Sequence, residues 1–273
     1  MPEGTEIRRE ADRIEAAIRG QKIEEIFFGL DRLSEWTSTL TGTTVENIGT
    51  RGKALLTTFD NGYTLYSHNQ LYGKWMIRKR GTLPKTNRQL RVALHTAKAS
   101  ALLYSASSIE VLPTEHLNDY PPIARLGPDV LDTELKWRDV ARRLRDPAFA
   151  GRALAALYLD QHFMAGIGNY LRSEILFTAG VNPSVRPKDL STARIGKLAR
   201  ATLSISRRSY ETGGMTAPQA IIRRLKKRGL SRSAYRFSVF AREGLPCHGC
   251  GEPIARITAN SRRLYYCQKC QNC

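Results

Sequence analysis

The chain opens with apolar side chains that recur every three or four residues between positions 5 and 19. This spacing is typical of an amphipathic helix. Glu6 and Glu10 lie near its start, where the helix dipole favours negative charge. The apolar face consists of Ile7, Ala11, Ile14, Ala17 and Ile18. The pattern therefore predicts an N-terminal helix.

From about residue 22 to residue 112 the pattern changes to short β-rich runs. Asp60-Asn61-Gly62 separates two of them and is typical of a tight turn. Strands at such intervals indicate an antiparallel sandwich or barrel. The runs are KIEEIFF at 22–28, KALLTTF at 53–59, YTLYSH at 63–68, LRVALHTA at 90–97 and ALLYSA at 101–106.

Beyond Gly127-Pro128-Asp129 the apolar spacing becomes helical, and we predict helices in 133–145, 152–163, 168–179, 188–205 and 216–228. Alternation resumes from Tyr235 to Phe240, which predicts a strand leading into the cysteine-rich end. The chain thus reads as an α+β protein. A length of 273 residues suggests two domains and a small module. We place the boundaries at 1–130, 131–234 and 235–273.

Positive charge is concentrated in the C-terminal half of the chain. The whole sequence carries +18, and residues 186–246 alone hold 15 basic against 3 acidic side chains, a net +12. Arg223, Arg224, Lys226, Lys227 and Arg228 form one run that could be a solvated helix face or a phosphate contact. The charge indicates a polyanionic partner, and a noncatalytic nucleic-acid-binding protein is one interpretation.

All five cysteines lie in the last 27 residues. Cys247, Cys250, Cys267 and Cys270 are spaced as two Cys-x2-Cys pairs, which can close one tetrahedral zinc site. Disulfides are the alternative, but nothing else indicates an oxidising compartment. Four thiolates fill a closed structural site, so we expect His248 not to be a ligand and Cys273 to be a free thiol. Few apolar residues surround this module, so zinc should supply much of its folding energy.

No apolar stretch approaches the roughly 20 residues that cross a bilayer, and the N-terminus lacks the basic and apolar regions of a signal peptide. We therefore expect neither a membrane span nor export. The expected location is the cytoplasm, in association with a bacterial nucleoid.

Several stretches together resemble the formamidopyrimidine-DNA glycosylase family, and they occur in family order over nearly the whole chain. They are MPEGTE at 1–6, RGKALL at 51–56, SHNQLYGKW at 67–75, RLGPDVL at 125–131, AGIGNYLRSEIL at 165–176, and the cysteine-rich end with SRR before YYC. The resemblance implies an N-terminal helix with an antiparallel β-sandwich, a helix-two-turn-helix domain and a zinc-ribbon hairpin.

The activity that this resemblance implies is that of a bifunctional DNA glycosylase and AP lyase. Such an enzyme flips a damaged base out of duplex DNA, releases it through a covalent iminium, and cuts the strand by β- and δ-elimination. We expect a monomer that binds damaged double-stranded DNA with one structural zinc ion and no redox or nucleotide cofactor.

Pro2 is the candidate nucleophile. Removal of the initiator methionine before proline would leave a secondary amine, and α-amino groups have a pKa of roughly 7.7 to 8.0, against about 10.4 for Lys. Such an amine can attack the deoxyribose C1′ atom. Pro2 alone could equally be a neighbour of the start codon. The resemblance adds Glu3 as a general acid and Glu6 as an orienting or proton-relaying group, although acidic residues are also common in a first helical turn.

Two basic residues complete the catalytic set that the resemblance implies. Lys53 would stand over the damaged nucleotide as proton donor and phosphate clamp, although a lone Lys is ordinarily a surface charge. Arg262, five residues before Cys267, would grip phosphate during δ-elimination. Its neighbour Arg263 is the alternative.

DNA-binding residues are expected in two further places. Glycines Gly166 and Gly168 allow close backbone approach before Asn169, and N–H groups at a helix start can bind a phosphate oxygen. Arg125 joins this contact in our prediction, while the neighbouring Asp129 is equally typical of an ordinary helix start.

Gln70, Leu71 and Tyr72 offer an amide, an apolar wedge and an aromatic face on one turn, suited to filling the space of a flipped nucleotide. A packed hairpin corner is the alternative. The HNQLYG stretch and the MPEG start are similar to the pyrimidine-directed branch of the family, and a preference for oxidised purines is the rival.

Two departures from the family pattern stand out. Thr5 replaces a frequent proline, which affects the helix entry. The stretch from Glu211 to Ala234 is longer than in the family pattern, and it is heavily basic. It could form an extra helix over DNA or a disordered loop.

Overall fold

A computed structural model describes residues 2–272 of the chain. The chain divides between Arg125 and Leu126 into two compact units, which are described in turn. The three-part division with boundaries at 130 and 234 stays a prediction.

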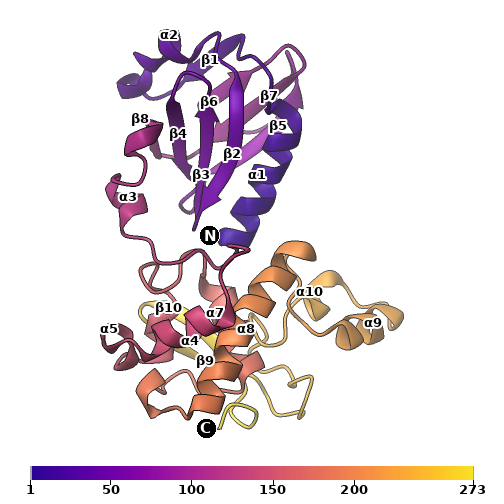
Figure 1. The fold of residues 1–273 in the computed structure, drawn as a ribbon. Helices are drawn as coiled ribbons and strands as arrows, with labels where there is room; N and C mark the ends of the chain where they lie inside the picture. The colour runs from indigo at the N-terminus through magenta and orange to yellow at the C-terminus, as the bar shows by residue number, and fades with distance from the viewer. Residues whose placement is uncertain (1, 273) are drawn as a thin grey trace. The chain divides into compact units, whose positions relative to one another are not determined.

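The first unit is a sandwich of two four-stranded antiparallel sheets (Figure 1). One sheet has the order β1-β6-β7-β5 and the other β2-β3-β4-β8. The strands are β1 (Glu25–Phe28), β2 (Val45–Arg51), β3 (Ala54–Phe59), β4 (Tyr63–His68), β5 (Lys74–Lys79), β6 (Leu90–His95), β7 (Ala99–Tyr104) and β8 (Ser108–Pro113). The unit also contains helices α1 (Gly4–Ile18), α2 (Trp36–Leu40) and α3 (Pro121–Ala124), and the short turns η1 (Asp31–Leu33) and η2 (Thr114–His116). The predicted sandwich is confirmed.

Helix α1 contacts strands of both sheets and contributes its apolar stripe to their shared core (Figure 1). Ile7, Ala11, Ile14 and Ile18 are at most 1% exposed. Burial of four such side chains fixes the helix against the sandwich. The start of α1 is therefore held in one position relative to the strands.

The sequence predicted the central strands and missed three edge strands. The runs at 53–59, 63–68, 90–97 and 101–106 correspond to β3, β4, β6 and β7, and the run at 22–28 to the edge strand β1. The missed strands β2, β5 and β8 lie at sheet edges. Edge strands commonly carry Lys, Arg, Pro or a bulge, as β2 does between Val45 and Asn47, and these interrupt the alternation on which prediction depends.

The second unit is mainly helical and ends in a two-stranded antiparallel hairpin. Its helices are α4 (Trp137–Arg145), α5 (Pro147–Ala150), α6 (Leu154–Leu157), α7 (Asn169–Ala179), α8 (Thr192–Glu211), α9 (Gln219–Lys227) and α10 (Arg232–Tyr235), with the turn η3 (Pro187–Asp189) and strands β9 (Ala255–Ala259) and β10 (Arg262–Tyr266). The predicted helix at 152–163 was too long, because only α6 is helical there.

Helix α7 lies at the centre of this unit and is buried along most of its length. It packs against α8 on one side and against β10 on another. Leu264 of the hairpin belongs to the same apolar core as Leu171 and Ile175 of α7. The hairpin is therefore attached to the helical core by apolar contacts. No described helix is long and apolar enough to cross a membrane.

The predicted strand from Tyr235 to Phe240 is wrong. The segment begins in α10, and the Glu174 carboxylate then accepts hydrogen bonds from the backbone N–H groups of Ser238, Val239 and Phe240 at 2.8 to 2.9 Å. The Thr216 hydroxyl donates a fourth bond at 2.6 Å. A strand would need these N–H groups for a neighbouring strand, so the buried carboxylate replaces a sheet partner.

We predict that Glu174→Ala lowers the stability of the second unit by about 3 to 5 kcal/mol, because four buried donors lose their acceptor. Thermal unfolding measures the change. Glu211→Ala, at an exposed position of α8, is the matched control and should change stability by no more than about 0.5 kcal/mol. Equal melting temperatures for the two variants would contradict the assigned role.

Candidate functional site

The start of α1 brings three predicted residues together. Glu3 is the N-cap and is 3% exposed, and its backbone carbonyl accepts from the N–H groups of Glu6 and Ile7. The Glu6 carboxylate accepts from the Glu3 N–H at 3.0 Å and pairs with Arg9 at 3.0 Å. Glu6 therefore holds the backbone beside Pro2 in place, which suits an orienting role. The catalytic roles of Pro2, Glu3 and Glu6 stay predictions.

Lys53 follows Gly52 in the tight turn between β2 and β3, where Gly52 has a φ of +58°. The adjacent strand β4 ends at His68, which pairs with Ala54. Burial lowers the pKa of His68, and the nearby positive charge of Lys53 lowers it further. Because Ala54 pairs with His68, Lys53 lies near the segment that follows β4.

That segment is the turn 69–73, which carries the predicted wedge. Its backbone closes through a bond from the Gly73 N–H to the Asn69 carbonyl at 2.7 Å. A side chain at Gly73 would meet the Asn69 backbone at 2.6 Å, so only glycine fits. Gln70 has a φ of +50°, and its N–H donates to His68 Nδ1 at 2.9 Å. The turn is therefore tightly constrained.

The three wedge candidates project from this turn. Leu71 is 51% exposed and Tyr72 is 67% exposed, so neither packs as a hairpin corner would. The Gln70 side chain accepts from the Ser107 hydroxyl at 2.8 Å, and Arg88 donates to the Tyr72 carbonyl. A large exposed apolar residue on a rigid turn is suited to insertion between bases.

Glu10 joins the wedge turn to α1. One carboxylate oxygen accepts from Asn69 Nδ2 at 2.6 Å, and the other accepts from the Trp75 N–H at 2.9 Å. These bonds lie on either side of the 70–73 segment. Burial raises the pKa of Glu10, while the bonds from Asn69 and Trp75 and the charges of Arg13 and Lys74 act in the opposite direction. The same helix thus positions both Pro2 and the wedge.

The second unit contains the predicted phosphate site at the start of α7. Gly166 has a φ of +93°, which favours glycine, and Gly168 is the N-cap. The Gln161 side chain accepts from the Gly166 N–H at 3.1 Å and donates to the Ile167 carbonyl at 2.9 Å. The Gln161 side chain thus holds the turn together by hydrogen bonds. Asn169 is the first residue of α7.

A fully buried arginine connects this turn to the hairpin. Arg172 donates to Asn169 Oδ1 at 2.7 Å, to the Ala155 carbonyl at 2.6 Å and to the Arg263 carbonyl at 3.2 Å. It therefore fixes the Asn169 side chain beside the strand that begins at Arg262. Arg262 and Arg263 are both exposed, so burial does not distinguish between them.

Arg125 caps α3 at the end of the first unit, whereas the three residues predicted with it belong to the second. Asp129 accepts from the Leu131 N–H at 2.8 Å and so has a local structural role. A contact of Arg125 with phosphate stays a prediction.

The four spaced cysteines converge, with all Sγ atoms within 4.8 Å of one another. The Sγ atoms of Cys250 and Cys267 are 3.4 Å apart, and those of Cys247 and Cys270 are 3.9 Å apart. A disulfide would need about 2.05 Å, and the four residues are free thiols. Tetrahedral zinc with bonds of about 2.3 Å requires sulfur separations close to those found. The cluster could therefore hold one metal ion.

His248 lies outside this cluster of ligand atoms. Its Nδ1 atom is 3.4 Å from the Arg242 guanidinium. Burial and the charges of Arg242 and Arg224 lower its pKa to about 4. Cys273, predicted to be a free thiol, lies outside the described residues.

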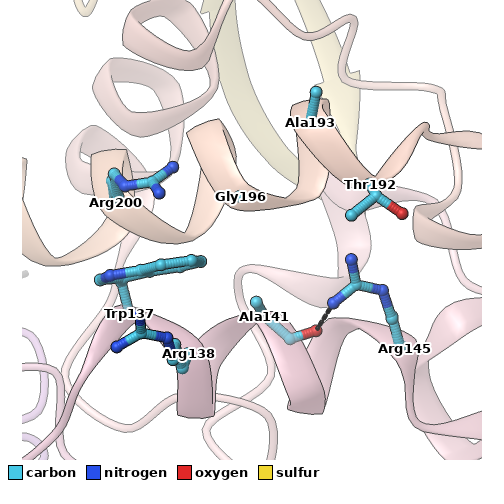
Figure 2. Close-up of a pocket in the computed structure, with 8 residues that line it drawn as sticks. All are labelled: Trp137, Arg138, Ala141, Arg145, Thr192, Ala193, Gly196 and Arg200. Atoms are coloured by element: carbon cyan, nitrogen blue, oxygen red, sulfur yellow. Dashed lines mark hydrogen bonds between the residues drawn. The ribbon is translucent and has the colours of Figure 1, made fainter.

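A cavity of about 410 Å³ between α4 and α8 contains none of the predicted residues (Figure 2). The Arg200 guanidinium carbon lies 3.8 Å from the centroid of the Trp137 ring, and Arg138 approaches the same ring at 5.0 Å. Gly196 makes room for Arg200. Its lining includes no acid or nucleophilic thiol, so we interpret these contacts as packing between the two helices.

Sequence reasoning missed the residues that position the site. Glu10 was assigned only to a helix start, and Arg172 and Glu174 were quoted only as part of a family stretch. Arg172 and Glu174 are charged residues in a largely buried helix, and Glu10 lies one turn from Ile7 and Ile14 on the apolar side of its helix. Such a position is a signal for a buried, hydrogen-bonded charge, but its partners lie far away in sequence.

Two family models match the chain. The model of the formamidopyrimidine-DNA glycosylase N-terminal domain matches residues 1–107, and the model of the formamidopyrimidine-DNA glycosylase H2TH domain matches residues 126–220.

Curated relatives match over the full length. Endonuclease 8 of Escherichia coli O17:K52:H18 (strain UMN026 / ExPEC) is 48% identical over 272 residues, covering 100% of both chains. Endonuclease 8 of Salmonella agona (strain SL483) is 48% identical over 271 residues, covering 99% of this chain and 100% of the relative.

Solved structures show the same fold. The wild-type Lactococcus lactis Fpg (MutM) in complex with DNA containing an oxidised pyrimidine has a TM-score of 0.83 at 22% identity, covering 100% of both chains. The same protein bound noncovalently to AP-site DNA has a TM-score of 0.82 at 21% identity, covering 99% of this chain and 100% of that one.

We predict that Glu10→Gln stabilises the protein relative to wild type more at about pH 7 than at about pH 4. The raised pKa means that ionisation above the ordinary value of 4.5 costs the folded state more than the unfolded state, so wild-type stability falls as the pH rises through that window. Glutamine removes this cost, and a flipped Asn69 amide preserves both hydrogen bonds. Melting temperatures at the two pH values measure the difference.

Glu24→Gln, at an exposed position of the same unit, is the control and should show almost no such pH dependence. An equal advantage of Glu10→Gln at both pH values would contradict the assigned cost of ionising Glu10.

Proposed function

Because this chain belongs to the formamidopyrimidine-DNA glycosylase family, as an endonuclease VIII, we propose that it removes oxidised pyrimidines from duplex DNA through a covalent bond to Pro2. The protein is a DNA glycosylase and AP lyase of base excision repair. The lesion class and the roles of individual residues are the proposed part. The observation that carries the proposal is the start of α1, where buried Glu3 adjoins Pro2 and the Glu6 carboxylate holds the backbone between them.

In the proposed reaction the Pro2 nitrogen attacks C1′ of the flipped nucleotide. The bond from C1′ to the base breaks and the base leaves with a proton. Glu3 protonates the ring oxygen O4′, so the sugar opens and C1′ forms an iminium with Pro2. Loss of a proton from C2′ then breaks the C3′–O3′ bond, and a second elimination breaks the C5′–O5′ bond. Hydrolysis of the iminium frees the enzyme and leaves a gap bounded by phosphates.

The other candidates serve binding in this proposal. Lys53 and Arg262 neutralise phosphate charge during attack and elimination. Asn169 and the N–H groups at the start of α7 bind a phosphate oxygen, with Arg125 as an additional contact. Gln70, Leu71 and Tyr72 fill the space left by the flipped nucleotide.

Zinc in the cysteine cluster has a structural role in this proposal. Four thiolates of Cys247, Cys250, Cys267 and Cys270 leave no open coordination position for chemistry. The metal would join the loop before β9 to the loop after β10, at the open end of the hairpin that carries Arg262.

Borohydride trapping on AP-site DNA tests the mechanism. We expect a covalent protein–DNA adduct, because reduction converts the iminium into a stable amine. An N-terminal extension that blocks Pro2 should abolish the adduct, since an amide nitrogen cannot form the iminium. Binding of the untagged protein without any adduct would favour a noncatalytic DNA-binding protein.

Parallel excision assays on duplexes with thymine glycol or 8-oxoguanine test the lesion class. We expect faster release of thymine glycol, because the HNQLYG stretch and the MPEG start resemble the pyrimidine-directed branch of the family. The fold does not decide the question, since the Lactococcus lactis structures with the same fold include complexes with oxidised-pyrimidine and Fapy-dG DNA. A clear preference for 8-oxoguanine would support the rival lesion class.

We predict about one zinc ion per chain, lost in Cys250→Ala, because three thiolates hold structural zinc far more weakly than four. Metal analysis measures the content, and limited proteolysis reports whether residues 243–272 remain folded. Cys273→Ala is the matched control and should retain both zinc and protease resistance. Full zinc content in Cys250→Ala would exclude the four-thiolate site.

A further inference from the structure

We propose that the basic helix, defined as α9 together with Arg228, is an accessory grip on the DNA backbone that adds affinity independent of the lesion. The inference rests on DNA binding under the proposed function and goes beyond its chemistry. It assigns a binding partner to a segment that contains none of the catalytic or wedge candidates. The helix lies at the periphery of the second unit (Figure 1).

The basic helix is folded around an apolar contact of its own. Ile222 is 3% exposed and Leu225 is 6% exposed, and both pack with Ala217 and Tyr235 in a small separate core. A disordered basic loop, one alternative from the sequence, is therefore excluded. The orientation of the helix is fixed, because its apolar side faces this core.

The remaining faces of the helix carry uncompensated positive charge. All five cations are exposed, and none forms an ion pair with any residue that the structure describes between 2 and 272. From Thr212 to Arg242 the sequence contains eight basic residues and no acidic one. The five cations are Arg223, Arg224, Lys226, Lys227 and Arg228.

The cations of the basic helix repel one another, and contact with a phosphate backbone would reduce this repulsion. Arg223 and Lys227 are four residues apart, as are Arg224 and Arg228, and like charges at this spacing destabilise a helix. The dipole favours cations in the last turn, but it does not account for Arg223 at the middle of the helix. Neutralisation by phosphates removes the repulsion and releases counterions.

The chemistry of the exposed side favours DNA over a protein partner. No large apolar side chain of α9 is exposed, since Ile222 and Leu225 are buried and Ile221 packs against the small core. Protein interfaces have an apolar centre depleted of charge. Contact with phosphates needs only positive charge and a fixed scaffold. The helix provides both.

The test replaces the five cations by glutamine and measures binding to undamaged duplex DNA between about 50 and 200 mM salt. We expect the slope of log affinity against log salt to become shallower by about 0.9 for each phosphate that is no longer neutralised, and by about 2 in total. Single-turnover excision at saturating enzyme should change by less than about twofold, because the chemistry is untouched. Circular dichroism and melting temperature show that the second unit remains folded.

The matched control replaces five exposed cations of the first unit, namely Lys22, Arg78, Lys79, Lys85 and Lys98. An equal decrease in slope for both variants would show that the effect depends only on the net charge of the protein. This outcome would overturn the proposal. An unchanged slope for the basic-helix variant would overturn the proposal as well, and it would favour an acidic protein as the partner of the helix. Failure of the proposed function would be recognised separately. The wild-type protein would then give no borohydride adduct on AP-site DNA, whatever the slope of its log affinity against log salt.

Discussion

Buried charge, satisfied by hydrogen bonds from distant segments, holds the candidate site residues in place. Glu10 accepts bonds from Asn69 and from the Trp75 backbone, 59 and 65 residues away. Arg172 connects Asn169 to the carbonyl of Arg263, 91 residues away. Such groups cost several kcal/mol when left unpaired in a protein interior. Each therefore restricts the chain to arrangements in which its partners are present.

Glu174 applies the same constraint to the approach to the cysteine cluster. Its carboxylate binds three consecutive N–H groups and the Thr216 hydroxyl. The segment before β9 thereby becomes a fixed loop rather than a strand. Since α7 also packs against β10, the helix that begins at the predicted phosphate site supports the hairpin whose second strand begins at Arg262. Two expected DNA contacts thus share one scaffold.

Exposed charges contribute less to the stability of the fold than buried, hydrogen-bonded charges do. The charged residues of α1 form pairs, such as Arg8 with Asp12 and Arg19 with Glu15, and pairs of this kind contribute little to stability. The cations of the basic helix have no such partners in the described structure. The sandwich is close to neutral while the second unit carries most of the positive charge. The field of the protein is therefore set mainly by its helical part.

Local sequence patterns were sufficient to predict the secondary structure of the core and the composition of the metal cluster. Helices with a full apolar stripe, central strands and closely spaced cysteines each have a local signature, because period and spacing are properties of neighbouring residues. Family stretches added the wedge turn and the nucleophile candidate. The missed edge strands have weaker signatures, because β2 contains a bulge, β5 begins and ends with basic residues, and β8 ends at a proline.

Which polar groups contact one another depends on the folded chain. The apparent strand from Tyr235 to Phe240 was diverted by a carboxylate more than 60 residues away, and no local pattern contains that information. The same holds for Glu10 and the wedge turn, and for the folding of the basic helix around Tyr235. Hydrogen bonds to buried charges are directional and long-range, so they become visible only when the chain is folded.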